Sequence, residues 1–307
     1  MRAPFIILLI ILLANLFVDL YIYIQCKRRC NSKSWSKLQK TTSIVLIAVM
    51  IVGMALPAKE GNDGMLLTKM WILFSYFTVY IPKYIAVIFD LLASIPRLWN
   101  HKRMKWATYA GILLSIFTFI SLWWGAFVNR YRIQVKEVAV EVTGLPKSFD
   151  GFKIAQFSDL HTGTFGTDTT FVAKLVNRIN SLDADIIVFT GDMVNRQSDE
   201  MNPFISVLSR LYAPGGTYAI LGNHDYGDYK NWPDNESKHK NMEDLYAGYK
   251  NAGITLLRND CRWIRNGVDS IALIGVENIG DPPFKTYGSL TKSYPDLSDA
   301  ASKILLT

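Results

Sequence analysis

Four long apolar runs in the first 128 residues constrain the fold of this chain more than any other feature. We predict transmembrane helices at residues 4–25, 41–57, 70–95 and 106–128. A helix of about 20 apolar residues is long enough to cross the hydrocarbon core of a bilayer. The first run has no basic segment beyond Arg2 and no evident small-residue cleavage site, so we interpret it as a retained helix and not as a signal peptide. Residues 129–307 then form a separate domain outside the bilayer.

Charge is distributed unevenly between these two parts. Residues 1–128 contain 14 Lys and Arg against 4 Asp and Glu, whereas residues 129–307 contain 19 against 22. A nucleic-acid-binding domain would need a basic face. Because the domain that follows the helices is slightly acidic, we expect no nucleic acid among its partners.

The basic residues also predict the orientation of the helices. Segments 27–40 and 96–105 carry six and four Lys or Arg, whereas segment 58–69 carries two. Short basic loops remain in the cytoplasm. We therefore expect an integral protein of the plasma or inner membrane, with the N-terminus and residues 129–307 outside the cytoplasm. If the second or third apolar run does not cross, the domain lies on the opposite side.

Three shorter runs in this domain share one design. Each is a β-branched and aromatic stretch that delivers polar side chains at its carboxyl end: Ile154–His161, Ile186–Asp192 and Tyr218–Asp225. Buried strands of parallel sheets have this composition, and α/β sheets bind ligands outside the carboxyl ends of their strands. Because helix-length segments separate the runs, the sequence predicts a metal site assembled from strand ends.

The rest of the domain alternates strand and helix patterns before shorter strands cluster. Strands are expected at 134–143, 152–158, 185–190, 217–221, 254–257, 261–264 and 270–276, and helices at 169–182, 203–211 and 242–252. Residues 226–240 have the composition of a polar loop, and the chain ends in a strand-like apolar run. This order predicts an α/β sandwich.

The strand ends supply ligands suited to a pair of divalent cations. The candidate residues are Asp159, His161, Asp192, Asn223 and His224. Such cations bind carboxylates and imidazoles, and a pair of them can clamp a phosphate ester and generate hydroxide at neutral pH. Strand residues two apart share a face, so Asp159 and His161 can turn toward one cavity.

These blocks resemble the calcineurin-like metallophosphoesterase family. The matching segments are Asp159-Leu160-His161, Gly191-Asp192-Met193-Val194-Asn195 and Gly222-Asn223-His224-Asp225, and the resemblance covers roughly residues 150–307. It implies an α/β fold that is a four-layer αββα sandwich, incomplete here and preceded by about four transmembrane helices. It also implies a cofactor of two divalent metal ions of Mn, Fe or Zn type.

The resemblance implies a metal-binding role for four of the matched residues. Asp159 and His161 would bind one metal, and Asp192 would bridge both. Asn223 would bind the second metal and can touch the phosphate.

The resemblance implies acid catalysis by the third block. His224 would be the general acid for the leaving alkoxide, with Asp225 orienting its imidazole. The expected activity is hydrolysis of phosphate mono- or diesters or of pyrophosphates. A membrane-anchored member resembles the subgroup that acts on lipid-linked or nucleotide-sugar pyrophosphates, so the expected partners are a phosphate-ester substrate and the bilayer.

The sequence departs from the family pattern at its C-terminal end. The family also uses a later His and a Gly-His-X-His block, but no histidine follows His239 here. We therefore interpret residues 129–307 as a C-terminally truncated domain, expected to be inactive by itself and to bind at most one metal weakly. The alternative is a catalytically inert membrane protein that uses the fold as a binding module.

Five further residues have two interpretations each. Asp19 and Asp90, inside apolar runs, could mark a polar path, or could face each other or the helix ends. Tyr226, Tyr229 and Trp232 could line a substrate entrance or only pack their loop.

Overall fold

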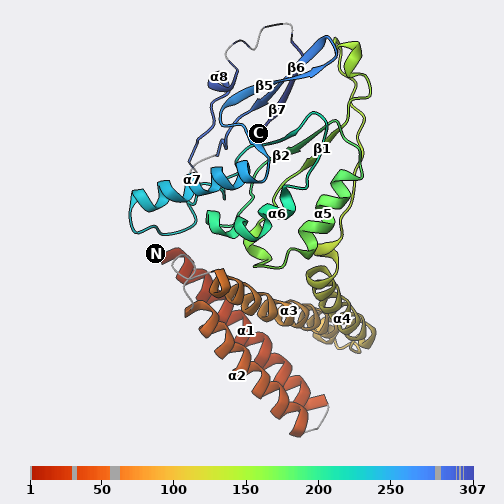
Figure 1. Ribbon diagram of the computed structural model, residues 1–307. Helices are drawn as coiled ribbons and strands as arrows, with labels where there is room; N and C mark the ends of the chain where they lie inside the picture. Colours follow the sequence, from red (N-terminus) through yellow and green to blue (C-terminus); the bar gives the residue numbers. More distant parts are fainter. Residues whose placement is uncertain are drawn as a thin grey trace. The chain divides into compact units, whose positions relative to one another are not determined.

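The computed structural model divides into two compact units, Met1–Arg132 and Ile133–Thr307 (Figure 1). It describes residues 2–29, 33–55, 63–280, 285–294, 296, 299 and 301–307. The parts of the predicted loops that fall on residues 30–32 and 56–62 lie outside the described residues.

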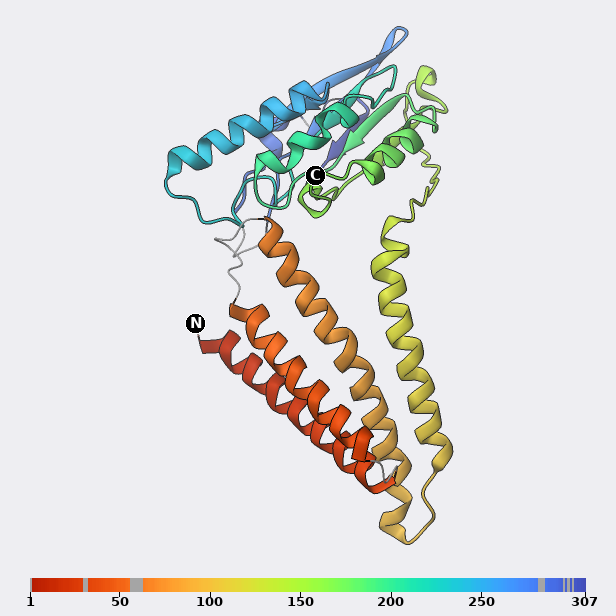
Figure 2. The same ribbon diagram turned by 60° about the horizontal axis from the view of Figure 1, so that its bottom comes forward.

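The first unit consists of long helices. They are α1 (Arg2–Arg29), α2 (Lys33–Ala55), α3 (Asp63–Ser94) and α4 (Lys105–Phe127), with the short 3-10 helix η1 (Ile95–Trp99) before α4. The described parts of all four are long and apolar enough to cross a membrane. The first three contact one another, and α4 runs antiparallel to α3 and packs along it (Figure 2). The predicted number of membrane helices is therefore confirmed by length and composition.

The helices extend beyond the apolar runs. The prediction of a polar loop over 27–40 is wrong for most of its residues, because α1 continues to Arg29 and α2 begins at Lys33. Likewise, α3 begins at Asp63, seven residues before the apolar run. Lys, Arg, Gln and Leu are good helix formers, so a helix does not end where its apolar run ends.

The acidic residues of the apolar runs do not pair with each other. Asp19 Oδ1 lies 2.8 Å from Nζ of Lys83 on α3. Asp90 Oδ1 lies 2.7 Å from Nη1 of Arg29 at the end of α1, and it also pairs with Arg103. A charge in an apolar medium persists only when it is paired. These carboxylates therefore tie α1 to α3 at two levels.

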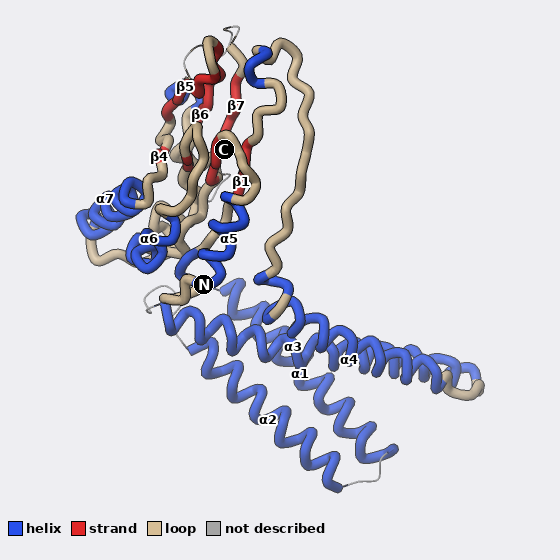
Figure 3. Tube along the Cα trace, turned by 45° about the vertical axis from the view of Figure 1, so that its right-hand side comes forward, coloured by secondary structure: helices blue, strands red, loops and turns tan. Residues whose placement is uncertain are grey.

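The second unit is built on two sheets (Figure 3). The first is parallel, in the order β1 (Ile154–Phe157), β2 (Ile186–Phe189), β3 (Thr217–Ala219) and β4 (Thr255–Leu256). In the second, β5 (Asp260–Asn266) is antiparallel to β6 (Asp269–Gly275), and β7 (Lys303–Leu306) is parallel to β6.

Apolar side chains of the two sheets meet in one core. This core includes Ile186, Val188, Ile220, Leu257, Ile271, Leu273 and Leu306. Strand residues alternate between faces, so the intervening residues of β2, Ile187 and Phe189, are buried on the opposite face of the parallel sheet. The sequence of β2 is therefore continuously apolar because both of its faces are covered.

Helices cover the outer face of each sheet. The parallel sheet packs against α5 (Thr170–Asn180), α6 (Ile205–Leu208) and α7 (Asn235–Asn251). The second sheet packs its outer face against Tyr294, at the end of the one-turn helix α8 (Leu290–Ser293). The order helix–sheet–sheet–helix is that of the predicted α/β sandwich.

Most predicted elements of this unit overlap observed ones, but the strand predicted at 134–143 is wrong. That segment is irregular in the structure, and Val138 and Val140 are 68% and 74% exposed. Alternating apolar residues favour a strand only where a neighbouring strand can accept its backbone hydrogen bonds. None of the described strands pairs with this segment.

The polar loop predicted at 226–240 is shorter than expected, because α7 begins at Asn235. Asp234 caps this helix, and its Oδ1 accepts a hydrogen bond from the backbone N–H of Ser237 at 2.6 Å. The helix predicted at 203–211 begins in the 3-10 helix η5 (Ser198–Phe204), and only Ile205–Leu208 of it form the α-helix α6. The cap, and not hydrophobic periodicity, marks the start of α7.

The loops that follow β2 and β3 touch at two glycines. A Cβ atom on Gly191 would lie 2.4 Å from the backbone nitrogen of Gly222. A Cβ atom on Gly222 would lie 2.5 Å from the backbone nitrogen of Asp192. Gly191 also has a φ of 103°, a backbone conformation that residues other than glycine rarely adopt. Glycine at both positions therefore allows the two loops to lie in contact at the carboxyl edge of the sheet.

This contact makes the effect of Gly222→Ala predictable. The added methyl group would push against backbone, so we expect the free energy of unfolding of the second unit to fall by about 2 kcal/mol or more. Gly253→Ala is the control without a steric clash, because a Cβ atom at Gly253 would meet open space, although its φ is 70°. It should cost only about 1 kcal/mol of backbone strain. Hydrogen exchange of β2 and β3 in denaturant measures both, and equal losses would contradict the steric explanation.

Candidate metal centre

Side chains that follow β1, β2 and β3 lie together at the carboxyl edge of the parallel sheet. His161, Asp192 and His224 each offer one ligand atom, and these atoms lie within 4.8 Å of one another. The parallel register of β1 with β2 and of β2 with β3 brings the three loops out side by side. The expected meeting of three strand ends therefore occurs in the structure for these three side chains.

Asp192 contacts the other two blocks. Its side chain is only 12% exposed, and its Oδ2 lies 3.7 Å from Nε2 of His161. Its Oδ1 accepts a hydrogen bond from the backbone N–H of His224 at 2.9 Å. One carboxylate oxygen of Asp192 therefore faces each of the two neighbouring loops.

Asp159 and Asn223 flank this centre. Asp159 is the more open of the two carboxylates, 66% exposed, with its Oδ1 3.9 Å from Nε2 of His161. The amide nitrogen of Asn223 donates a hydrogen bond to the phenol oxygen of Tyr229 at 2.7 Å. The other polar atom of that amide, its oxygen, is of the type that binds cations.

Backbone hydrogen bonds hold the first two loops in an unusual conformation. Asp159, His161 and Asp192 have φ values of 55°, 46° and 62°, in the left-handed region that non-glycine residues seldom adopt. The N–H of Asp159 donates to the carbonyl of Gly191, and the N–H of His161 donates to the carbonyl of Asp192. Such strain persists only where surrounding contacts over-determine it, and it concentrates at functional sites.

Three groups fix the imidazole of His224. Its Nδ1 lies 2.8 Å from the backbone carbonyl oxygen of Asn195. The ring of Tyr229 stacks on one face, with ring centroids 4.2 Å apart and planes 16° apart. The ring of His161 lies edge-on to it, with 4.8 Å between ring centroids and 89° between ring planes. An Nδ1–H that donates to this carbonyl leaves Nε2 as the ring nitrogen without this contact.

Asp225 has partners that differ from those expected. It is fully buried, and its carboxylate accepts hydrogen bonds from the backbone N–H groups of Asp192, Val194 and Gly222. Burial raises the pKa of the Asp225 carboxyl to about 7, and these hydrogen bonds oppose that effect. Asp225 therefore ties two loops together. The group that contacts Nδ1 of His224 is the backbone carbonyl of Asn195, whereas we predicted that Asp225 would orient this imidazole.

Sequence reasoning gave no role to Asn195 and left that of Tyr229 open. The Asn195 contact uses a backbone oxygen, which every residue carries, so no sequence signal could have found it. Tyr229 lies in a polar loop without periodicity. His239 is exposed, and its Nδ1 lies 3.4 Å from Oε1 of Glu243 on the same helix.

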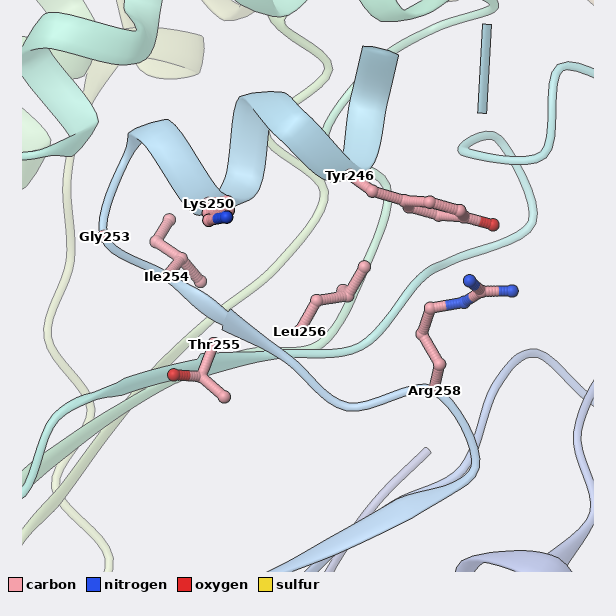
Figure 4. A pocket seen from close by; sticks show the side chains of 7 residues that line it. All are labelled: Tyr246, Lys250, Gly253, Ile254, Thr255, Leu256 and Arg258. Atoms are coloured by element: carbon pink, nitrogen blue, oxygen red, sulfur yellow. The ribbon is translucent and has the colours of Figure 1, made fainter. Parts of the chain in front are cut away.

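A separate groove of about 480 Å³ lies beside β4 (Figure 4). Its lining residues are Tyr246, Lys250, Gly253, Ile254, Thr255, Leu256 and Arg258. The guanidinium of Arg258 lies 4.1 Å from the ring centroid of Tyr246. None of the candidate site residues lines this groove, so the candidate centre rests on its donor atoms and not on cavity size.

The donor set fits a divalent transition metal. Two imidazoles and a nearly buried carboxylate converge, and a second carboxylate lies beside them. Mn, Fe and Zn ions bind these donors, whereas Ca²⁺ and Mg²⁺ prefer oxygen ligands alone.

Comparison with known proteins identifies both units. A family model described as "Probable Calcineurin-like phosphoesterase, transmembrane domain" matches residues 1–130. A second, described as "Calcineurin-like phosphoesterase", matches residues 152–291.

Three curated relatives that the chain matches are named as metallophosphoesterases or as a pyrophosphatase. The chain is 31% identical over 185 residues to the uncharacterized metallophosphoesterase YkuE of Bacillus subtilis, which covers 59% of this chain and 58% of that protein. It is 38% identical over 126 residues to the UDP-2,3-diacylglucosamine pyrophosphatase LpxG of Chlamydia trachomatis, covering 39% and 38%. It is 27% identical over 169 residues to a transmembrane protein with metallophosphoesterase domain of Danio rerio, covering 52% and 38%. The chain thus spans less than two thirds of the length of each of these relatives.

The second family match begins two residues before β1, so it includes all three strand ends that carry the metal-binding cluster. The chain therefore belongs to the calcineurin-like phosphoesterase family, in a form whose phosphoesterase domain follows a four-helix transmembrane domain.

Proposed function

We propose that this protein is a membrane-anchored hydrolase that uses two divalent metal ions of Mn, Fe or Zn type to cleave phosphate esters or pyrophosphates. The observation that carries this proposal is the convergence of His161, Asp192 and His224 within 4.8 Å at the ends of three parallel strands. The family match supports the class of reaction.

Four residues are proposed to hold the metals. Asp159 and His161 bind the first ion, Asp192 bridges to the second, and Asn223 binds the second. The bound pair would neutralise the charge of the phosphate and lower the pKa of the attacking water. The left-handed backbone of Asp159, His161 and Asp192 supports this assignment, because strained backbone of this kind concentrates at functional sites.

His224 is proposed to protonate the leaving oxygen. Its Nδ1 is engaged by the carbonyl of Asn195, so Nε2 is the atom that can transfer the proton. A second role competes with this one, because a ring nitrogen of His224 also lies within 4.8 Å of donor atoms of His161 and Asp192 and could bind a metal.

The proposed substrates are lipid-linked or nucleotide-sugar pyrophosphates, with the phosphoesterase domain outside the cytoplasm. The four apolar helices support a substrate that is available at a membrane. A relative whose name gives it a UDP-diacylglucosamine substrate supports the pyrophosphate class. The uneven charge of the loops supports the orientation.

We expect Asp192→Asn to abolish metal retention in the full-length protein, because the amide removes the shared negative charge at the centre. Affinity for Mn²⁺ should fall more than about 100-fold, beyond the 10- to 100-fold loss typical of outer-shell partners. Calorimetric titration with Mn²⁺ and hydrolysis of bis-p-nitrophenyl phosphate measure the two effects. Asp183→Asn is the control, since Asp183 has a similar φ of 48° but lies outside the site.

Near-normal turnover by Asp192→Asn would remove the bridging assignment. A full-length wild-type protein that neither binds Mn²⁺ nor hydrolyses the ester would indicate an inert binding module.

His224→Ala should distinguish the two roles of this residue. A general acid matters most for poor leaving groups, so we expect a loss of about 100-fold or more on alkyl phosphates. The loss on p-nitrophenyl esters should be about tenfold or less, with unchanged metal content, because p-nitrophenolate leaves without protonation. Equal losses on both substrates, together with lost metal, would make His224 a ligand instead. His239→Ala serves as the control.

The proposed orientation predicts which residues are accessible from outside the cell. In a cysteine-free background, Val268→Cys lies in the fully exposed turn between β5 and β6. His101→Cys lies in the basic loop before α4. A membrane-impermeant maleimide should label position 268 on intact cells and position 101 only after permeabilisation. The reverse pattern would place the phosphoesterase domain in the cytoplasm.

A further inference from the structure

One aromatic residue contacts two members of the candidate site. The phenol oxygen of Tyr229 accepts the hydrogen bond from the amide nitrogen of Asn223 at 2.7 Å. Its ring also stacks on the imidazole of His224, with 4.2 Å between centroids and 16° between planes. Tyr229 therefore lies against one proposed metal ligand and the proposed general acid at once.

The loop that carries Tyr229 is tethered on both sides of it. Before it, the carboxylate of Asp228 accepts hydrogen bonds from Lys238 of α7 and from the hydroxyl of Tyr287, the latter at 2.6 Å. After it, the indole N–H of Trp232 donates to the backbone carbonyl at position 227 at 2.7 Å. These contacts on both sides of Tyr229 hold its ring in a defined position.

Each contact of Tyr229 removes a rotational freedom that the proposed chemistry cannot tolerate. An asparagine amide has a nitrogen end and an oxygen end, and only the oxygen binds a cation. When the phenol oxygen takes the nitrogen of Asn223, the oxygen is the end presented to a metal. An imidazole can also rotate about its bond to Cβ, and the stacked ring restrains the plane of His224 while the carbonyl of Asn195 restrains one edge.

We propose that Tyr229 is a positioning residue of the metal centre, whose hydroxyl sets the amide of Asn223 and whose ring sets the imidazole of His224. The inference rests on the proposed function, because it takes from there the roles of these two residues. Another tyrosine of the same loop has a different environment. Tyr226 is buried, stacks on Tyr287 with 3.6 Å between centroids, and its hydroxyl accepts from the N–H of Asn278.

The two functions of Tyr229 can be separated by substitution. Tyr229→Phe removes the hydroxyl and keeps the ring, so affinity for Mn²⁺ should fall about tenfold, as expected of an outer-shell partner. The ratio of rates on p-nitrophenyl and alkyl phosphates should stay as in the wild type. Tyr229→Leu removes both, so it should lose the same affinity and about tenfold more rate on alkyl esters than on p-nitrophenyl esters. Tyr226→Phe is the matched control and should bind Mn²⁺ as the wild type does.

Calorimetric titration with Mn²⁺ and the two rates together test the inference. Wild-type affinity in Tyr229→Phe, in a protein whose wild type binds Mn²⁺, would overturn the role of the hydroxyl and leave the proposed function intact. Equal losses on both ester types in Tyr229→Leu would overturn the role of the ring. A full-length wild type that binds no Mn²⁺ would overturn the proposed function and, with it, this inference. Hydrogen exchange of β3 shows whether either variant perturbs the fold. If Tyr229→Leu does, the nearly isosteric Tyr229→Phe variant decides the test.

Discussion

The carboxylate of Asp225 is the contact on which the geometry of the site depends. It accepts three backbone N–H groups, from Asp192 and Val194 in the loop after β2 and from Gly222 in the loop after β3. A buried carboxylate is costly unless such bonds compensate it. Because its position is fully buried, these N–H groups replace water entirely, and the two loops are held as one body. These hydrogen bonds to Asp225 therefore determine the distance between the side chains of Asp192 and His224.

Two glycines and strained backbone in the same loops also determine the geometry of the site. Gly191 and Gly222 let the two backbones touch, and His161 and Asp192 beside them have left-handed φ values of 46° and 62°. Each strained residue costs of the order of 1 kcal/mol or more. The loops can carry that cost because β2 is covered on both faces by apolar side chains. Stability of the sheet and precision of the site are therefore linked.

Sequence patterns predicted those parts of the molecule in which residue type and chain position coincide. Apolar length identified the membrane helices, and polar residues at the ends of apolar strands identified the three loops that meet. Contacts between distant residues were not predictable. Asp225 was expected to face an imidazole and instead faces backbone, and the alternating valines of 134–143 had no partner strand. Pairing depends on tertiary neighbours, which one sequence does not specify.

The partners of four carboxylates also explain why a cation belongs at this site. In the first unit, Asp19 and Asp90 are neutralised by Lys83 and by two arginines. In the part of the chain that the structure describes, no lysine or arginine forms an ion pair with Asp159 or Asp192; both face the imidazole of His161 at 3.7–3.9 Å. An imidazole balances a carboxylate only when it is protonated, whereas a neutral imidazole and two carboxylates together attract a divalent ion. The negative charge left at the carboxyl edge of the sheet is therefore the electrostatic reason to place metal there.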